Sequence, residues 1–360
     1  MSPPPVRYWV FNYMPQWEGV SKEIASLREG LRDGIAGSLV SVETKQRALA
    51  LRGNDKRVPL PYGLLLYPLL RAYAAREGIN HLFASGGERW LTPMLAAPNG
   101  VLTVAKDTTS LRAYERNGEF FKRFRAVVVQ SERDREIMRQ LGVNRDTLWL
   151  IRPGVGAVPY REARDPFTIL FASSPLSPEH FLSRGVYLIV RAAARLPDVR
   201  FLLVWRKRHL AELKRVIAAE RATNVEIMNG VIPDMGPVYD RVHATILPGL
   251  EQRSFIPCPR SALESLAHGK PLLLSNCVSL ADGVARAGAG VAFEPTSDGL
   301  EAAIRELRAR YARYQERTQC YLAERFCPRV HLELYRRLYG RMGCPGLERR
   351  PPVTACGEPA

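Results

Sequence analysis

The 360-residue sequence contains no run of about 20 apolar residues, the length that a membrane-spanning helix needs. Its longest uncharged run covers residues 90–105, and prolines and a glycine interrupt it. The N-terminus lacks the basic segment followed by a long apolar core that marks a secretory signal peptide. We therefore expect neither a membrane span nor a signal peptide.

Patterns of metal-binding residues are also missing. Six cysteines lie in the last third of the sequence, but no two of them form a C-x-x-C pair, and no H-x-x-x-H or D-x-D spacing occurs. Clustered ligands of these kinds are what zinc and other divalent cations need. The sequence therefore predicts no metal site, and isolated thiols are the simplest interpretation of the cysteines.

Positive charge is in excess: 52 lysines and arginines face 36 acidic residues, which gives a formal charge of +16. Such an excess favours an anionic partner, either nucleic acid, a phosphate-bearing substrate or an anionic lipid surface. Residues 1–156 carry +8 and the remainder carries +8, so no basic tail exists. Because no zinc finger, ribonucleoprotein motif or basic-region heptad is present, we expect no nucleic-acid partner.

Short apolar segments alternate with amphipathic segments along most of the chain, the pattern of parallel β-sheets flanked by helices. The pattern restarts after a stretch rich in proline and arginine. The sequence therefore predicts an α/β fold with two domains, and the cleft between them is the default ligand site. The predicted divisions are a first domain at 1–157, a linker at 158–166, a second domain at 167–328, a closing helix at 329–342 and a disordered tail at 343–360.

Residues 258–275 form the most informative segment. Pro259 suits the first turn of a helix, apolar residues follow at helical spacing, and Gly269 can end the helix before a buried strand. Free backbone N–H groups at the start of such a helix form an anion site. Glu264 lies about a turn and a half further on, where it can reach the hydroxyl groups of a ribose beside a bound diphosphate.

This segment resembles the donor-binding helix of retaining glycosyltransferases of the GT-B fold, family four in particular. Further segments resemble the family's motifs in the same order: WEGVS at 17–21, VVVQS at 127–131, IRPGV at 151–155, FASSPLSPE at 171–179, SRGV at 183–186 and GAGVAF at 288–293. The resemblance covers roughly residues 6–341. It implies two Rossmann-like domains that face each other across a cleft.

The resemblance also implies a nucleotide-sugar donor, a glycan, lipid-linked or small-molecule acceptor, retention of the anomeric configuration, and neither cofactor nor metal. In the second domain, Glu264 would bind the ribose. The diphosphate would meet the following residues: Arg184, Arg206, Lys207, Pro259, Arg260 and Ser261. In the first domain, the acceptor-side loop would comprise Gly19, Val20, Ser21, Lys106 and Asp107. Ser21 can also cap the helix that follows it. No side chain stands out as a nucleophile.

The sequence departs from the family at one acidic position. The family usually carries E-x(7)-E, whereas Ile256 stands eight residues before Glu264. Three interpretations stay open: an active transferase in glycan assembly, a catalytically inactive binding or scaffold protein of the same fold, and a relative that performs epimerisation or phosphorolysis.

An apolar stripe within residues 58–73 has cations on both sides, Lys56 and Arg57 before it and Arg71 and Arg76 at its end. Such a stripe can lie on anionic lipid; the alternative is a core helix with solvated ends. We expect a cytoplasmic protein. Peripheral association with the inner face of the membrane stays open beside the core-helix alternative.

Overall fold

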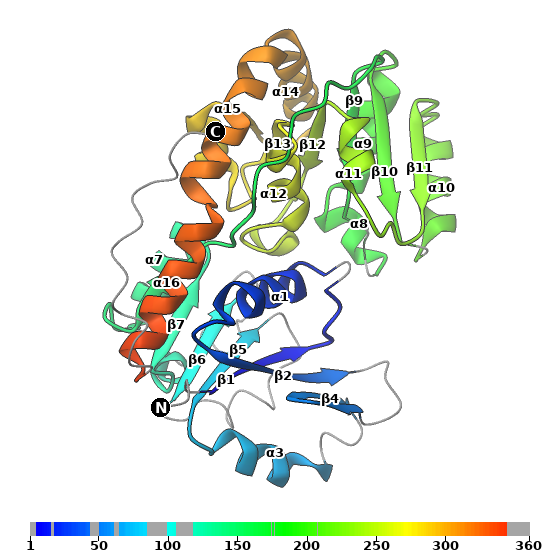
Figure 1. Ribbon diagram of the computed structural model, residues 1–360. Helices are drawn as coiled ribbons and strands as arrows, with labels where there is room; N and C mark the ends of the chain where they lie inside the picture. Colours follow the sequence, from blue (N-terminus) through cyan, green and yellow to red (C-terminus); the bar gives the residue numbers. More distant parts are fainter. Residues whose placement is uncertain are drawn as a thin grey trace. The chain divides into compact units, whose positions relative to one another are not determined.

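The computed structural model describes residues 5–15, 18–43, 50–60, 65–84, 99–105, 118–173, 175, 177–206 and 208–343. The chain divides into two compact units (Figure 1). Unit 1 comprises Met1–Gly154 and Pro328–Ala360, and unit 2 comprises Val155–Cys327. Within the described residues, none of the helices combines the length and the apolar character that a membrane span requires.

Unit 1 is built on an eight-stranded sheet in the order β3-β4-β2-β1-β5-β6-β7-β8. All neighbouring strands are parallel except β3 and β4, which are antiparallel. Its strands are β1 (Pro5–Phe11), β2 (Ala36–Glu43), β3 (Ala50–Arg52), β4 (Asp55–Pro59), β5 (Ile79–Ala84), β6 (Gly100–Val104), β7 (Ala126–Val129) and β8 (Leu148–Leu150). The fully buried run of β7 explains why this segment reads as a continuous apolar stretch.

Helices cover both faces of this sheet. Its helices are α1 (Gly19–Leu31), α3 (Tyr67–Ala74), α6 (Gly118–Lys122), α7 (Glu132–Gln140) and α16 (Pro328–Arg341). Apolar side chains of α1 and α16 share one core cluster with the sheet, whereas those of α3, α6 and α7 share the other. The expected closing helix thus belongs to unit 1, because Tyr335, Leu338 and Tyr339 of α16 are buried there.

Buried polar contacts connect α16 to the sheet. His81 on β5 is fully buried, with Nδ1 2.6 Å from the Tyr339 hydroxyl and Nε2 2.7 Å from Oγ1 of Thr103. Thr103 Oγ1 in turn lies 3.2 Å from the Tyr335 hydroxyl. Burial lowers the pKa of His81 well below 6.5, and the charge of His331 lowers it further. His81 is therefore neutral in the folded protein.

This burial predicts a pH-dependent stability. Below about pH 6.5 the unfolded chain protonates His81 while the folded chain does not, so the free energy of unfolding should fall as pH falls. Titration of His81 changes the free energy of unfolding by up to about 1.4 kcal/mol for each pH unit. Urea unfolding at pH 7.5, 6.5 and 5.5 should show a shallower pH slope in His81→Gln than in the wild type. Identical slopes would contradict the assignment.

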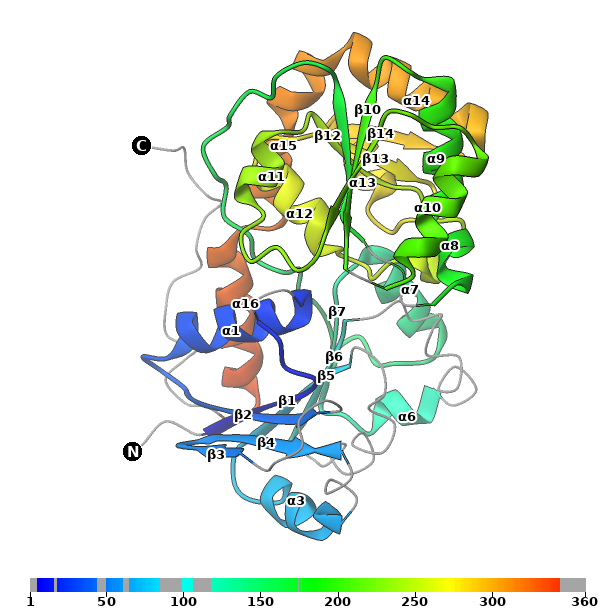
Figure 2. The ribbon, with the colours of Figure 1, turned by 90° about the vertical axis from the view of Figure 1, so that its right-hand side faces the viewer.

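Unit 2 contains a six-stranded parallel sheet in the order β11-β10-β9-β12-β13-β14 (Figures 1 and 2). Its strands are β9 (Thr168–Phe171), β10 (Arg200–Trp205), β11 (Val225–Asn229), β12 (Ala244–Leu247), β13 (Leu272–Ser275) and β14 (Gly290–Phe293). Its helices are α8 (Glu179–Ser183), α9 (Val186–Arg195), α10 (Leu210–Ala219), α11 (Gly236–Asp240), η2 (Gln252–Ser254), α12 (Arg260–Ala267), α13 (Ala281–Ala287), α14 (Ser297–Ala309) and α15 (Tyr311–Arg325).

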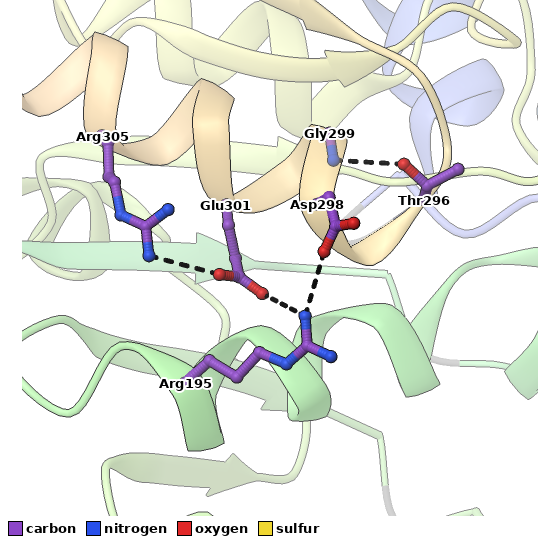
Figure 3. Close-up of polar contacts among 6 residues, drawn as sticks. All are labelled: Arg195, Thr296, Asp298, Gly299, Glu301 and Arg305. Carbon is purple, nitrogen blue, oxygen red and sulfur yellow. Dashed lines mark hydrogen bonds and ion pairs between the residues drawn. The ribbon is translucent and has the colours of Figure 1, made fainter.

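An ion-pair network joins α9 to α14 within unit 2 (Figure 3). Arg195, at the end of α9, lies 3.2 Å from a carboxylate oxygen of Asp298 and 2.8 Å from one of Glu301. Arg305 contacts the second oxygen of Glu301 at 3.2 Å. The Thr296 hydroxyl accepts a hydrogen bond from the Gly299 backbone N–H and so caps α14. These contacts fix two helices that pack on the sheet.

The division between the units differs from the expected one. The boundary falls after Gly154, and the segment predicted as a linker packs on unit 2, where the Val158 backbone N–H donates to the Ala267 carbonyl at 2.9 Å. Of the tail predicted at 343–360, all residues from 344 onward lie outside the described residues. The expectation of six isolated thiols is wrong for Cys327, which is disulfide-bonded, whereas Cys258, Cys277 and Cys320 form no disulfide.

Candidate functional site

Three neighbouring strands of unit 2 end beside one another, and polar residues follow each of them. Ser173 comes two residues after β9, Arg206 directly follows β10, and residues 248–255 follow β12. Since the strands are parallel, these residues gather at the carboxyl edge of the sheet, where open α/β sheets bind ligands.

The junction between α8 and α9 is fixed against the loop after β12. Gly185 has φ +68°, and a Cβ placed on it would lie 2.0 Å from the carbonyl oxygen of Pro248. The Ser183 carbonyl accepts hydrogen bonds from the Leu250 backbone N–H at 2.8 Å and from the Ser254 hydroxyl at 2.6 Å. Only glycine permits this close approach, which places the neighbouring Arg184 at the edge of the sheet.

Arg184 is held at this edge by contacts with two segments. Its Nη1 donates to the Ser173 hydroxyl at 2.7 Å, and its guanidinium carbon lies 5.7 Å from the centre of the Phe255 ring. Burial lowers the pKa of Arg184, and the positive charge of Arg206 lowers it further. The pKa of His180 is lowered by burial and by the charge of Arg184. An anion bound beside Arg184 and Arg206 would offset the repulsion between their two charges.

Glu264 is oriented from two sides on α12. Nε of Arg260 donates to one carboxylate oxygen at 3.0 Å, and the Tyr239 hydroxyl lies 3.5 Å from the other. That hydroxyl also donates to the Ser261 carbonyl at 3.0 Å. The Glu264 side chain keeps 18% of its surface exposed, so the carboxylate can still accept hydrogen bonds from a ligand.

Pro259 has a different role from the one expected. It is the N-cap residue of α12, with extended backbone, and the helix begins at Arg260. No side chain caps the first turn, so the backbone N–H groups that follow Pro259 suit an anion.

The expected acceptor-side loop is largely helical instead. Gly19, Val20 and Ser21 form the first turn of α1, and Val20 and Ser21 are buried. Glu18 is the N-cap residue: its Oε2 accepts hydrogen bonds from the Ser21 backbone N–H at 2.7 Å and from the Ser21 hydroxyl at 2.8 Å. The prediction that Ser21 caps this helix is therefore wrong, because the longer Glu18 side chain reaches the same N–H group.

The other residues considered from the sequence either lie outside the described residues or do not contact the site at the carboxyl edge of the sheet. Lys106, Asp107 and Lys207 lie outside the part of the chain that the structure describes. Ile256 is half-buried, and the nearby Glu251 accepts a hydrogen bond from the Ser254 backbone within η2. The structure adds side chains that sequence reasoning missed: His180, Tyr239 and Phe255. No local pattern marks them, because they meet the site only through the fold.

Comparison with known proteins agrees with this architecture. Residues 167–310 match the family model described as Glycosyl transferases group 1. Sucrose-phosphate synthase from Thermosynechococcus elongatus is similar in structure, with TM-score 0.73, 16% identity, and coverage of 94% of this chain and 100% of that chain.

Two further solved structures show the same fold. A glycosyltransferase from Rickettsia africae has TM-score 0.68, 16% identity, and coverage of 97% and 100%. HepE from Anabaena, solved in complex with UDP-glucose, has TM-score 0.72, 15% identity, and coverage of 93% and 99%. No curated protein matches the sequence significantly.

Proposed function

We propose that this chain is a glycosyltransferase that moves a sugar from a nucleotide-sugar donor to a glycan, a lipid-linked or a small-molecule acceptor. Two observations support the proposal: residues 167–310 match the family model described as Glycosyl transferases group 1, and the chain shares the fold of a solved glycosyltransferase. Retention of the anomeric configuration and independence of metal and cofactor are parts of the same proposal. The observation that carries it is the pair of neighbouring cations, Arg184 and Arg206, at the carboxyl edge of the unit 2 sheet.

The donor's diphosphate fits this edge best. Burial lowers the pKa of the half-buried Arg184, and the charge of Arg206 lowers it further, so an anion bound beside both would favour the charged form of Arg184. Two phosphates supply the opposite charges, and the N–H groups at the start of α12 supply further donors. HepE from Anabaena, which shares the fold, was solved with UDP-glucose bound. That complex supports a donor of the same chemical class.

The proposed chemistry follows from charge development. When the bond between the sugar and the diphosphate breaks, negative charge grows on the departing diphosphate. Arg184, oriented by the Ser173 hydroxyl before the reaction, stabilises that charge without reorganisation, and Arg206 adds a second positive charge. Glu264 accepts hydrogen bonds from the ribose hydroxyls and so fixes the position of the leaving group.

Unit 1 would position the acceptor in this proposal. The candidate residues are Gly19, Val20 and Ser21 in the first turn of α1, together with Lys106 and Asp107. Because Val20 and Ser21 are buried, the contribution of this turn would come from its backbone and from the Glu18 carboxylate. We also propose that the protein works in the cytoplasm, peripherally at the inner face of a membrane.

Glu264→Gln is expected to weaken binding of the nucleotide-sugar about tenfold or more, since hydrogen bonds to a charged group are worth about 1.5–3 kcal/mol. Titration calorimetry with UDP-, GDP- and ADP-sugars measures this. Glu212→Gln, on α10 of the same unit, is the control and should bind like the wild type. Unchanged affinity in Glu264→Gln would remove Glu264 from the ribose site, and no binding of any nucleotide-sugar by the wild type would overturn the proposed function.

The alternative of a catalytically inactive binding protein rests on Ile256, which stands in place of the family's first glutamate. The two functions differ in one measurable quantity, the release of nucleoside diphosphate from a bound donor. An active transferase releases it faster when acceptor is present, whereas a binding protein retains the donor unchanged.

A further inference from the structure

The most exposed large apolar side chains among the described residues lie in unit 1. Leu65 is 76% exposed, Leu69 66% and Leu51 64%. A single leucine exposed to this degree is common on protein surfaces. A group of such side chains on one surface marks a contact site.

The three leucines belong to neighbouring elements. In the β3–β4 pair, Leu51 lies directly opposite Lys56, and directly opposed residues point to the same face of a sheet. Nζ of Lys56 lies 4.6 Å from the centre of the Tyr73 ring on α3. Both views show α3 beside this edge of the sheet (Figures 1 and 2). Leu51 is therefore on the side of the sheet that α3 covers.

Helix α3 presents two different faces. Leu70 and Ala74 are buried in the core of unit 1, whereas Pro68, Leu69 and Ala72 are exposed. At helical spacing, positions 68, 69 and 72 share one side, and Leu65 precedes them by a turn. The apolar stripe is thus split: one side of it is core and the other faces solvent.

Cations gather at the Tyr73 ring of α3, on the same helix as this exposed stripe. The ring centre lies 4.6 Å from Nζ of Lys56 and 5.5 Å from the guanidinium of Arg76, and the guanidinium of the buried Arg7 lies 5.4 Å from it. Burial lowers the pKa of Arg7, and the positive charge of Arg76 lowers it further. Arg71 is exposed on α3, and Glu77 is the exposed acid that follows Arg76. The surface is therefore positive as well as apolar.

We propose that this surface docks on an anionic phospholipid membrane. The surface, named the α3 patch, comprises Leu51, Leu65, Leu69, Lys56, Arg71 and Arg76. The leucines enter the headgroup boundary, and the cations bind lipid phosphates, as in other interfacial amphipathic surfaces. The formal charge of +8 in residues 1–156 attracts the same membrane from a distance. The inference gives a location to the proposed membrane association, and its test does not depend on sugar transfer.

Sedimentation of the full-length chain with vesicles tests the proposal. Vesicles of phosphatidylcholine alone are compared with vesicles that contain about 30% phosphatidylglycerol, a fraction that makes the surface clearly anionic. We expect binding to the anionic vesicles, weak binding to the neutral ones, and weaker binding as salt rises. Equal sedimentation with both kinds of vesicle, or none with either, would overturn the proposal.

Variants of exposed residues keep the fold intact and separate the two contributions. Arg71→Gln with Arg76→Gln should weaken binding about 25-fold, since one cation at an anionic surface contributes about fivefold. Leu65→Ser with Leu69→Ser should weaken binding at least tenfold. Val231→Ser, exposed in unit 2, is the matched control and should bind like the wild type.

Nucleotide-sugar binding is measured in the same variants. Retained donor binding with lost vesicle binding supports the α3 patch independently of the proposed function. Vesicle binding at the wild-type level in both double variants would overturn the assignment of the surface.

Discussion

Arg184→Gln is expected to lower kcat/KM for sugar transfer about 100-fold, within the range measured when one fixed electrostatic donor is removed from an active site. The reason is geometric. Arg184 is oriented by the Ser173 hydroxyl at 2.7 Å and by the Phe255 ring, so its charge is in place before the diphosphate leaves. Glutamine keeps a hydrogen-bond donor on a shorter side chain and removes the charge.

The stability of this variant distinguishes a site residue from a structural one. Because burial and the charge of Arg206 both disfavour the positive form of Arg184, its removal should change the free energy of unfolding by no more than about 1 kcal/mol. Arg191→Gln, on the exposed side of α9 and paired with Glu220, serves as the control and should retain full activity. A kcat/KM of Arg184→Gln within threefold of the wild type would contradict the role of Arg184.

Gly185→Ala is expected to lower the free energy of unfolding by about 3 kcal/mol or more and to abolish donor binding. A side chain at φ +68° costs about 1–2 kcal/mol, and the new Cβ would lie 2.0 Å from the Pro248 carbonyl oxygen. Relief of that overlap requires the loop after β12 to move away from the Ser183 carbonyl, which displaces Arg184. Urea unfolding and calorimetry measure the two effects.

Gly288→Ala is the matched control for this substitution. Gly288 also has φ +68°, but the nearest atom to its added Cβ is Cγ of Arg317 at 3.7 Å. In this variant the free energy of unfolding should fall only by the cost of the backbone conformation, about 1–2 kcal/mol, and donor binding should be normal. Equal losses of stability in the two alanine variants would show that the contact with Pro248 is unimportant.

The sequence was sufficient for the parts of the site that depend on order along the chain. Alternating segments predicted two parallel sheets, and residues that follow parallel strands must gather at one edge, which is why Ser173 and Arg206 lie at the same edge of the unit 2 sheet. The start of α12 and the position of Glu264 on it could be predicted because proline, apolar spacing and glycine mark a helix locally.

Parts of the site that depend on tertiary contacts could not be predicted. Tyr239 reaches Glu264 and Ser261 from α11, and Phe255 covers Arg184 from the loop after β12. The cap of α1 depended on side-chain reach: both Glu18 and Ser21 carry suitable oxygens, and only the fold shows that Ser21 is inside the helix. The apolar stripe was ambiguous for the same reason, because spacing alone does not reveal which face the sheet covers.

The central claim is that unit 2 holds a diphosphate between Arg184 and Arg206. The most direct measurement compares, by titration calorimetry, the affinity of a nucleoside diphosphate with that of the matching nucleoside monophosphate, in the wild type and in Arg184→Gln. We predict that the wild type binds the diphosphate at least tenfold more tightly and that Arg184→Gln loses most of this preference. Equal affinities for the two nucleotides in the wild type would contradict the account.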